Sequence, residues 1–263
     1  MAEVPDAQVT LPKVTLGVST KLYLSIEDTQ AWARVVATIA RSHPAVRDGI
    51  VRLFVLPSLP AVAAVRKALA GTPVLVGAQD LSVFDRGAYT GEVSGEDLAA
   101  LGCALVEVGH AERRRLFGED DGVVARKVAA AVRNRLIPVL CVGETARGTA
   151  EEAISQSIAQ LEASLTEVDE ANPTELIVAY EPVWAIGQAE PAEPEHIRVV
   201  AAALRTRVDA DPRITRGSII YGGSAQRGVL TDLGRAVDGL FLGRHAHDPA
   251  ELGRIIDEAA ATD

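Results

Sequence analysis

Ionisable side chains and glycine turns stand at five places along this chain, each at or just after the end of a short apolar segment. They are Lys21, His110, Glu181, the Gly222-Gly223-Ser224 turn and the Gly243-Arg244 turn. An ammonium group, an imidazole and a carboxylate can supply positive charge, hydrogen bonds and proton transfer. Glycine turns allow backbone N–H groups to come close to a phosphate. If the five segment ends meet at one rim, they suit chemistry on a small phosphorylated sugar.

The segments that must position these residues are rich in valine, isoleucine and leucine. There are eight, at residues 14–19, 50–56, 74–79, 104–109, 137–143, 176–181, 218–222 and 238–243. Most are continuous rather than alternating, which is typical of strands buried on both faces of a parallel sheet. Their starts are about 32 residues apart on average, the length of a strand–helix–strand unit. Amphipathic, alanine-rich stretches between them predict the intervening helices.

Eight such units in 263 residues predict a single-domain (β/α)8 barrel over residues 1–263. We expect residues 1–13 to form a short, loosely ordered N-terminal segment. Alternation alone also allows a doubly wound open sheet, but neither GxGxxG nor GxxxxGK[ST] occurs in the chain. In a barrel, the carboxyl ends of all the strands form one rim, which is where active sites of this fold lie.

Composition excludes several classes of function. The chain has 36 acidic and 26 basic residues, a net charge of −10 and no basic run, which argues against binding to nucleic acid or to an anionic membrane. It has no apolar run of about 20 residues and no secretory leader pattern, so we expect a cytoplasmic protein without a membrane span. Cys103 and Cys141 lie in apolar runs without metal-ligand spacing, and we expect buried thiols and no metal site.

Motifs along nearly the whole chain resemble those of the triosephosphate isomerase family. They are Gly77-Ala78-Gln79, GAYTGE from Gly87 to Glu92, GHAERR from Gly109, CVGE from Cys141, YEPVWAIG from Tyr180 and YGGS from Tyr221. The resemblance implies a barrel fold, an isomerase that needs no cofactor, and a homodimer. It implies that the loop from Gly87 to Glu92, including Thr90, interdigitates with the partner, although an exposed polar loop is the alternative.

The resemblance also implies roles for the ionisable residues. Glu181 would be the general base that removes a proton beside a carbonyl, and the apolar loop after it would close and expel water; otherwise Glu181 is a capping carboxylate. His110, at the start of a helix whose dipole disfavours the imidazolium, would exchange protons with the two oxygens of an enediolate; otherwise it is structural. Lys21 would stabilise the phosphate and the oxyanion, supported by Glu112; otherwise it is a solvated surface lysine.

Backbone N–H groups after the last strands would bind the phosphate dianion. The resemblance places these groups at Gly187, Ser224, Gly243 and Arg244. The alternative is that the glycines only form turns. For the Arg244 side chain two interpretations stand side by side, added charge near the phosphate or projection into solvent.

Three positions depart from the family pattern: Ser19 replaces an asparagine, Ala111 a serine and Arg244 a glycine. Ser19-Thr20-Lys21 and the GLFLGR run resemble a branch of the family that isomerises erythrulose phosphates. L-Erythrulose 1-phosphate is dihydroxyacetone phosphate with a hydroxymethyl group added at the carbon that loses its proton. The smaller Ser19 leaves room for this group, so a four-carbon ketose phosphate is the leading substrate. A triose phosphate is the alternative, and a non-catalytic phosphosugar-binding barrel is a more distant one.

Overall fold

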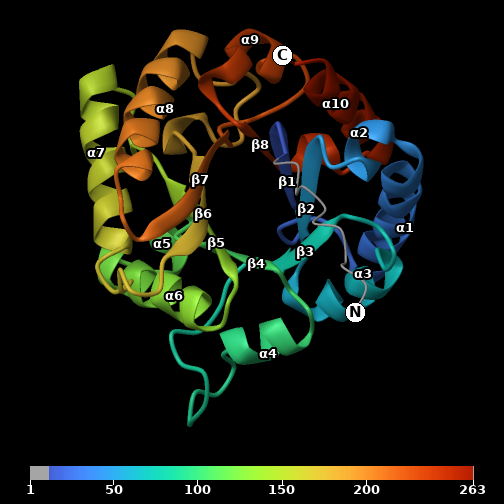
Figure 1. The fold of residues 1–263 in the computed structure, drawn as a ribbon, viewed down its shortest axis with the longest axis horizontal. Coiled ribbons are helices and arrows are strands. Elements are labelled where there is room, and N and C mark those ends of the chain that lie inside the picture. The colour runs from blue at the N-terminus through green and yellow to red at the C-terminus, as the bar shows by residue number, and fades with distance from the viewer. Residues whose placement is uncertain (1–11, 263) are drawn as a thin grey trace, which may run out of the picture.

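Eight parallel strands close into a barrel in the order β1 to β8. The computed structural model describes residues 12–262. The strands are β1 (Val14–Ser19), β2 (Val51–Leu56), β3 (Leu75–Ala78), β4 (Leu105–Val108), β5 (Ile137–Val142), β6 (Thr174–Tyr180), β7 (Ile214–Tyr221) and β8 (Gly239–Leu242). Figure 1 looks into the barrel and shows the helices arranged around it. The predicted (β/α)8 barrel is therefore confirmed.

Two strands begin earlier than their apolar runs. β6 starts at Thr174 rather than residue 176, and β7 starts at Ile214 rather than residue 218. The added residues include Glu175 and Arg216, which pair in register at the amino end of the barrel. Because these positions are polar and only partly buried, a search for continuous apolar runs does not detect them.

Helices connect the strands around the outside of the barrel. They are α1 (Ile26–Ser42), α2 (Pro44–Arg47), α3 (Val62–Ala68), α4 (Gly95–Ala100), α5 (Ala111–Phe117), α6 (Asp121–Arg133), α7 (Ala150–Ser164), α8 (Pro194–Asp209), α9 (Val229–Leu233) and α10 (Pro249–Ala261). Local sequence explains their starts. The Ser25 hydroxyl accepts the N–H of Asp28 to cap α1, and Asp248 caps α10 ahead of Pro249.

Side chains that point alternately to the two faces of each strand form two apolar cores. Inward-facing side chains fill the barrel, including Phe54, Leu105, Ile177 and Phe241. Outward-facing side chains pack against the helices in a larger cluster. Cys103 and Cys141 are free and buried, as predicted. The barrel interior is thus a packed core, and the carboxyl end of the barrel is where a site of this fold is expected.

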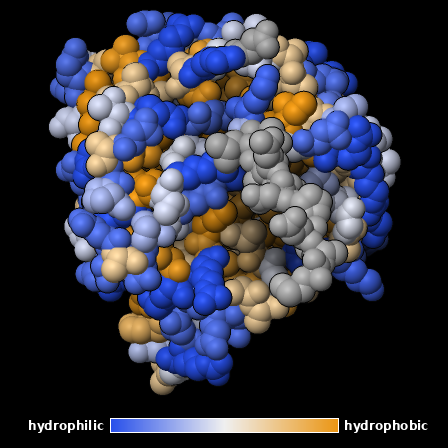
Figure 2. All heavy atoms as spheres, viewed as in Figure 1, coloured by the Kyte–Doolittle hydropathy of each residue, from blue (hydrophilic) through white to orange (hydrophobic). Residues whose placement is uncertain are grey.

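The outer surface is mostly polar on the face shown in Figure 2, where hydrophobic side chains appear mainly between hydrophilic ones. A long loop before α4 projects from the ring of helices in Figure 1 and contains the stretch from Gly87 to Glu92. Within residues 12–262, no helix has the length and apolar character to cross a membrane. Most of the predicted N-terminal segment, residues 1–11, lies outside the described residues.

Candidate active site

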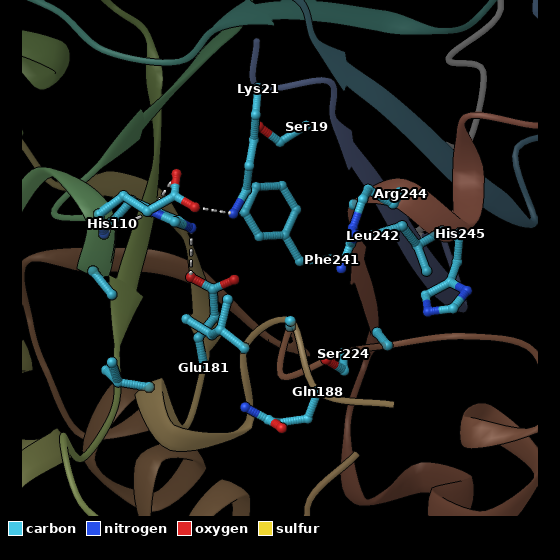
Figure 3. A pocket seen from close by; sticks show the side chains of 18 of the residues that line it. Ser19, Lys21, His110, Glu181, Gln188, Ser224, Phe241, Leu242, Arg244 and His245 are labelled. Carbon is cyan, nitrogen blue, oxygen red and sulfur yellow. Dashed lines mark hydrogen bonds and ion pairs between the residues drawn. The ribbon is translucent and has the colours of Figure 1, made fainter. Parts of the chain in front are cut away.

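A cavity of about 330 Å³ opens at the carboxyl end of the barrel, and all nine site residues predicted from the sequence line it. They are Ser19, Lys21, His110, Glu112, Glu181, Gly187, Ser224, Gly243 and Arg244. Figure 3 shows Lys21, His110 and Glu181 on one side of this cavity and Ser224, Arg244 and His245 on the other. We call these sides the catalytic half and the phosphate half, after the roles that the sequence predicts for their residues. Tertiary structure therefore brings together residues from both ends of the chain.

The Lys21 side chain is held by a carboxylate. It follows β1 with a left-handed backbone (φ 47°), and its Nζ donates to Glu112 Oε1 over 2.7 Å. Burial alone would lower the pKa of Lys21, but the hydrogen bond to Glu112 and the charge of Glu181 raise it above its usual value. Burial raises the pKa of Glu112, but the hydrogen bond and the charge of Lys21 lower it further, so this pKa lies below its usual value. Both partners are therefore ionised at neutral pH.

His110 has its tautomer fixed by the backbone. It caps α5, and its Nδ1 accepts the N–H of Glu112 over 3.1 Å. The proton of the neutral ring is then on Nε2, because Nδ1 is occupied as an acceptor. Nε2 lies 3.6 Å from Glu181 Oε2. The ring can thus donate from Nε2 to an oxygen held beside Glu181.

Glu181 follows β6 directly and is only 5% exposed. Its N–H donates to Val142 O over 2.8 Å, which extends the ladder with β5. Its Oε2 has no hydrogen-bond partner among the described residues. A Cβ at Gly222 would lie 2.6 Å from Glu181 Oε1, so this glycine makes room for the carboxylate. A buried carboxylate oxygen with a free lone pair can accept a proton from a ligand in the cavity.

The loop after Glu181 is fastened at both ends and exposed at its tip. Trp184 Nε1 donates to Glu144 Oε1 over 2.8 Å, and the Ala192 N–H donates to the Tyr221 hydroxyl over 2.9 Å. Between them, Gly187 has a left-handed backbone (φ 75°) and is exposed beside the cavity. The part of the loop between these two anchors lines the cavity.

The phosphate half is formed mainly by backbone. Among residues 12–262, none of four backbone N–H groups at the cavity donates a hydrogen bond: those of Gly187, Ser224, Gly243 and Arg244. Unpaired N–H groups gathered at one cavity are suited to an anion. The Arg244 side chain is exposed but lines the cavity, and its guanidinium lies 5.6 Å from the centre of the Tyr23 ring. Its place in the lining fits added charge at the cavity, and its exposure fits projection into solvent.

Sequence reasoning assigned no role to two buried acidic residues, although one of them, Glu144, belongs to the CVGE motif. Glu144 is 1% exposed and binds Trp184, Tyr180 and His196, so it anchors the loop after Glu181. Glu107 is 3% exposed and points into the barrel from β4. An acidic residue inside the apolar run 104–109 was the available signal for Glu107. Within residues 12–262, no group of three or more histidine, cysteine or acidic side chains is arranged to hold a metal ion.

Comparison with known proteins identifies relatives along most of the chain. The family model for triosephosphate isomerase matches residues 14–259. An L-erythrulose-1-phosphate isomerase of Pectobacterium atrosepticum is 52% identical over 94% of this chain and 96% of its own length. Triosephosphate isomerases of Leifsonia xyli and Halorhodospira halophila are 41% and 43% identical, over 79% and 81% of this chain and 83% and 87% of their own lengths.

Proposed function

This chain belongs to the triosephosphate isomerase family, and on that premise we propose that it isomerises a small phosphorylated ketose, most specifically L-erythrulose 1-phosphate to D-erythrulose 4-phosphate. The observation that carries the reaction class is the meeting of Lys21, His110 and Glu181 at one cavity with four free backbone N–H groups. The 52% identity to an L-erythrulose-1-phosphate isomerase supports the substrate. A cytoplasmic location is part of this proposal.

The mechanism needs only side chains of this protein. Glu181 removes the proton from the carbon beside the carbonyl, and the electron pair of that C–H bond forms the enediolate. His110 donates from Nε2 to the carbonyl oxygen and recovers a proton from the neighbouring hydroxyl, which moves the carbonyl by one carbon. Glu181 then returns its proton to the other carbon. Lys21 stabilises the negative charge that develops on the oxygens.

The four-carbon substrate requires more room at the reacting end than a triose does. Ser19 ends β1 at the floor of the cavity, is 3% exposed, and carries a hydroxyl where a larger polar side chain would reduce the space. A hydroxymethyl group fits beside such a small residue. The identities of 41% and 43% to triosephosphate isomerases favour dihydroxyacetone phosphate as the second candidate substrate.

Paired kinetics test the substrate. We expect the wild-type kcat/KM for L-erythrulose 1-phosphate to exceed that for dihydroxyacetone phosphate. Ser19→Asn should lower the ratio of the two values by about 10- to 200-fold, because it crowds the hydroxymethyl group. Efficient turnover of the triose together with no turnover of the tetrulose by the wild type would contradict the four-carbon assignment and leave the isomerase mechanism standing.

We also propose a homodimer formed through the loop from Gly87 to Glu92. Phe84 and Tyr89 stack at the base of this loop with ring centres 3.8 Å apart, and both are exposed. Leu22, Leu116 and Phe117 are 87%, 61% and 67% exposed and line a second cavity beside the active site. Apolar groups exposed together are typical of a protein interface. The occupant proposed for this second cavity is the projecting loop of a second copy of the chain.

The solution mass of the protein tests the dimer. Analytical ultracentrifugation should give twice the chain mass for the wild type, whereas Phe117→Glu should shift the protein to the monomer. A wild-type monomer at micromolar concentration would contradict this proposal.

A further inference from the structure

Glu107 is a buried carboxyl group that the mechanism above does not use. On β4, Val106 and Val108 face the helices and Leu105 faces the barrel interior. Strand alternation therefore turns Glu107 into the interior, one layer above Leu105 towards the active site. Burying an ionisable side chain in an apolar core is unfavourable unless polar partners surround it. Its surroundings are therefore informative about its role.

The partners of Glu107 leave part of its hydrogen-bonding capacity free. The Ser19 hydroxyl donates to its Oε2 over 3.2 Å, and the Cys141 thiol lies 4.0 Å from its Oε1. A carboxyl group has about four acceptor positions. One hydrogen bond and one weak thiol contact do not fill them, and the Ser19 oxygen keeps lone pairs of its own.

Glu107 lies close to the reacting centre. Its Oε1 is 3.9 Å from His110 Nε2, which lies 3.6 Å from Glu181 Oε2 on the other side. Glu107 lines the second cavity, of about 510 Å³, which shares Ser19 and His110 with the active-site cavity. A ligand oxygen bound to His110 Nε2 is therefore close to Glu107 and to the Ser19 hydroxyl that donates to it.

Glu107 can accept a hydrogen bond from a ligand hydroxyl in either of its protonation states. Burial raises the pKa of Glu107 to about 7, against opposing contributions from His110 and Lys21. The neutral and ionised forms are both populated near neutral pH. Either form has an oxygen that can accept a hydrogen bond from a hydroxyl group.

We infer that Glu107 and Ser19 together determine substrate specificity, by binding the terminal hydroxyl of the hydroxymethyl group that distinguishes a four-carbon ketose phosphate from a triose phosphate. This inference rests on the proposed function. That hydroxyl is two bonds from the carbon that loses its proton, which places it beside the His110–Glu181 pair. A triose phosphate has no group to offer the Ser19–Glu107 pair, so contact with the pair favours the larger substrate.

The test measures kcat/KM of the full-length protein for L-erythrulose 1-phosphate and for dihydroxyacetone phosphate. Glu107→Leu removes the hydrogen-bond acceptor and replaces the glutamate with an apolar side chain of similar size. We expect it to lower the tetrulose-to-triose ratio about tenfold to 100-fold, with the triose value changed only a few-fold. Glu107→Gln, which retains an acceptor oxygen, should recover most of the ratio. If Glu107→Leu does not fold, Glu107→Asp withdraws the carboxyl group by one methylene and should lower the ratio in the same direction.

Ser218→Ala is the matched control for Ser19→Ala. Ser218 is a buried hydroxyl that faces the barrel interior from β7, outside the lining of either cavity. Ser19→Ala should lower the substrate ratio and Ser218→Ala should not. If the wild type accepts the tetrulose but Glu107→Leu and Glu107→Asp change both substrates equally, Glu107 is structural and this inference is wrong. If the wild type does not accept the tetrulose, the proposed substrate itself is wrong, and this inference with it.

Discussion

The two halves of the active-site cavity are built from different parts of the polypeptide. The catalytic half consists of charged side chains that position one another, as Glu112 does for Lys21 and the Glu112 N–H does for His110. The phosphate half consists mainly of backbone N–H groups presented by turns. The catalytic half should therefore be sensitive to side-chain chemistry, and the phosphate half to side-chain volume.

Two glycines that directly follow neighbouring strands make this difference measurable. A Cβ at Gly222 would lie 2.6 Å from Glu181 Oε1, whereas nothing lies within 4 Å of a Cβ at Gly243. Gly222 thus leaves room for a protein group, and Gly243 leaves room that a ligand can occupy. Substitution of Gly222 should therefore affect proton transfer, and substitution of Gly243 should affect binding of the phosphate group.

The largest effect is expected from Glu181→Gln. The amide is nearly isosteric but cannot accept the substrate proton, so kcat should fall by at least about 10²- to 10⁴-fold. Binding of an unreactive phosphate ester such as glycerol 3-phosphate, measured by calorimetry, should change only a few-fold, because the phosphate half is intact. A fall in the single-turnover rate of less than about tenfold would mean that another group is the base.

Gly222→Ala should have the next largest effect. The added methyl group displaces the Glu181 carboxylate, and a misplacement of about 1 Å in a catalytic group costs about 10²-fold in rate. We expect kcat to fall far more than the affinity for glycerol 3-phosphate. Gly253→Ala, on α10 with nothing within 4 Å of its Cβ, is the control and should retain normal kinetics. Equal losses in rate and affinity would show that Gly222 does not act through Glu181.

Gly243→Val should give the opposite result. The side chain has space in the folded protein, but it occupies the approach to the backbone N–H groups of the phosphate half. Loss of charge-assisted hydrogen bonds should weaken the binding of glycerol 3-phosphate about tenfold to 100-fold. Competition by inorganic phosphate should weaken in parallel in steady-state assays. Unchanged affinities would exclude this turn from the phosphate half.

The smallest effect concerns the pH dependence of stability, which should arise from Glu107, beside His110 of the catalytic half. Burial raises the pKa of Glu107 from its ordinary 4.5 to about 7, and the facing charges of His110, Glu181 and Lys21 modify it. Between these pH values the folded protein holds a proton that the unfolded chain releases, so stability falls as pH rises through this window. Relative to Glu107→Gln, the free energy of unfolding of the wild type should fall by on the order of 2–3 kcal/mol between pH 4.5 and pH 8.

Urea denaturation at fixed protein concentration measures this difference. Glu167→Gln, at an exposed residue after α7, is the control for loss of a surface carboxylate. A constant difference between wild type and Glu107→Gln would mean that Glu107 titrates alike in the folded and unfolded states.

The sequence by itself determined the fold and most members of the site. Continuous apolar runs at a regular spacing predicted eight parallel strands, because strands buried on both faces carry few polar residues. In a barrel their carboxyl ends share one rim, so reading the residues around the end of each run drew attention to Lys21, His110 and Glu181. Glycines in turns signalled the phosphate half, because close backbone approach requires them.

Only the tertiary structure decided how these residues contact one another. Ser19 and Glu107 are 88 positions apart, and their hydrogen bond exists because barrel closure turns both side chains into one layer. The free Oε2 of Glu181 and the occupied Nδ1 of His110 likewise depend on neighbours from other strands and from the backbone. Residue type limits which bonds a side chain can form, but burial and distance select among them, and both are properties of the folded chain.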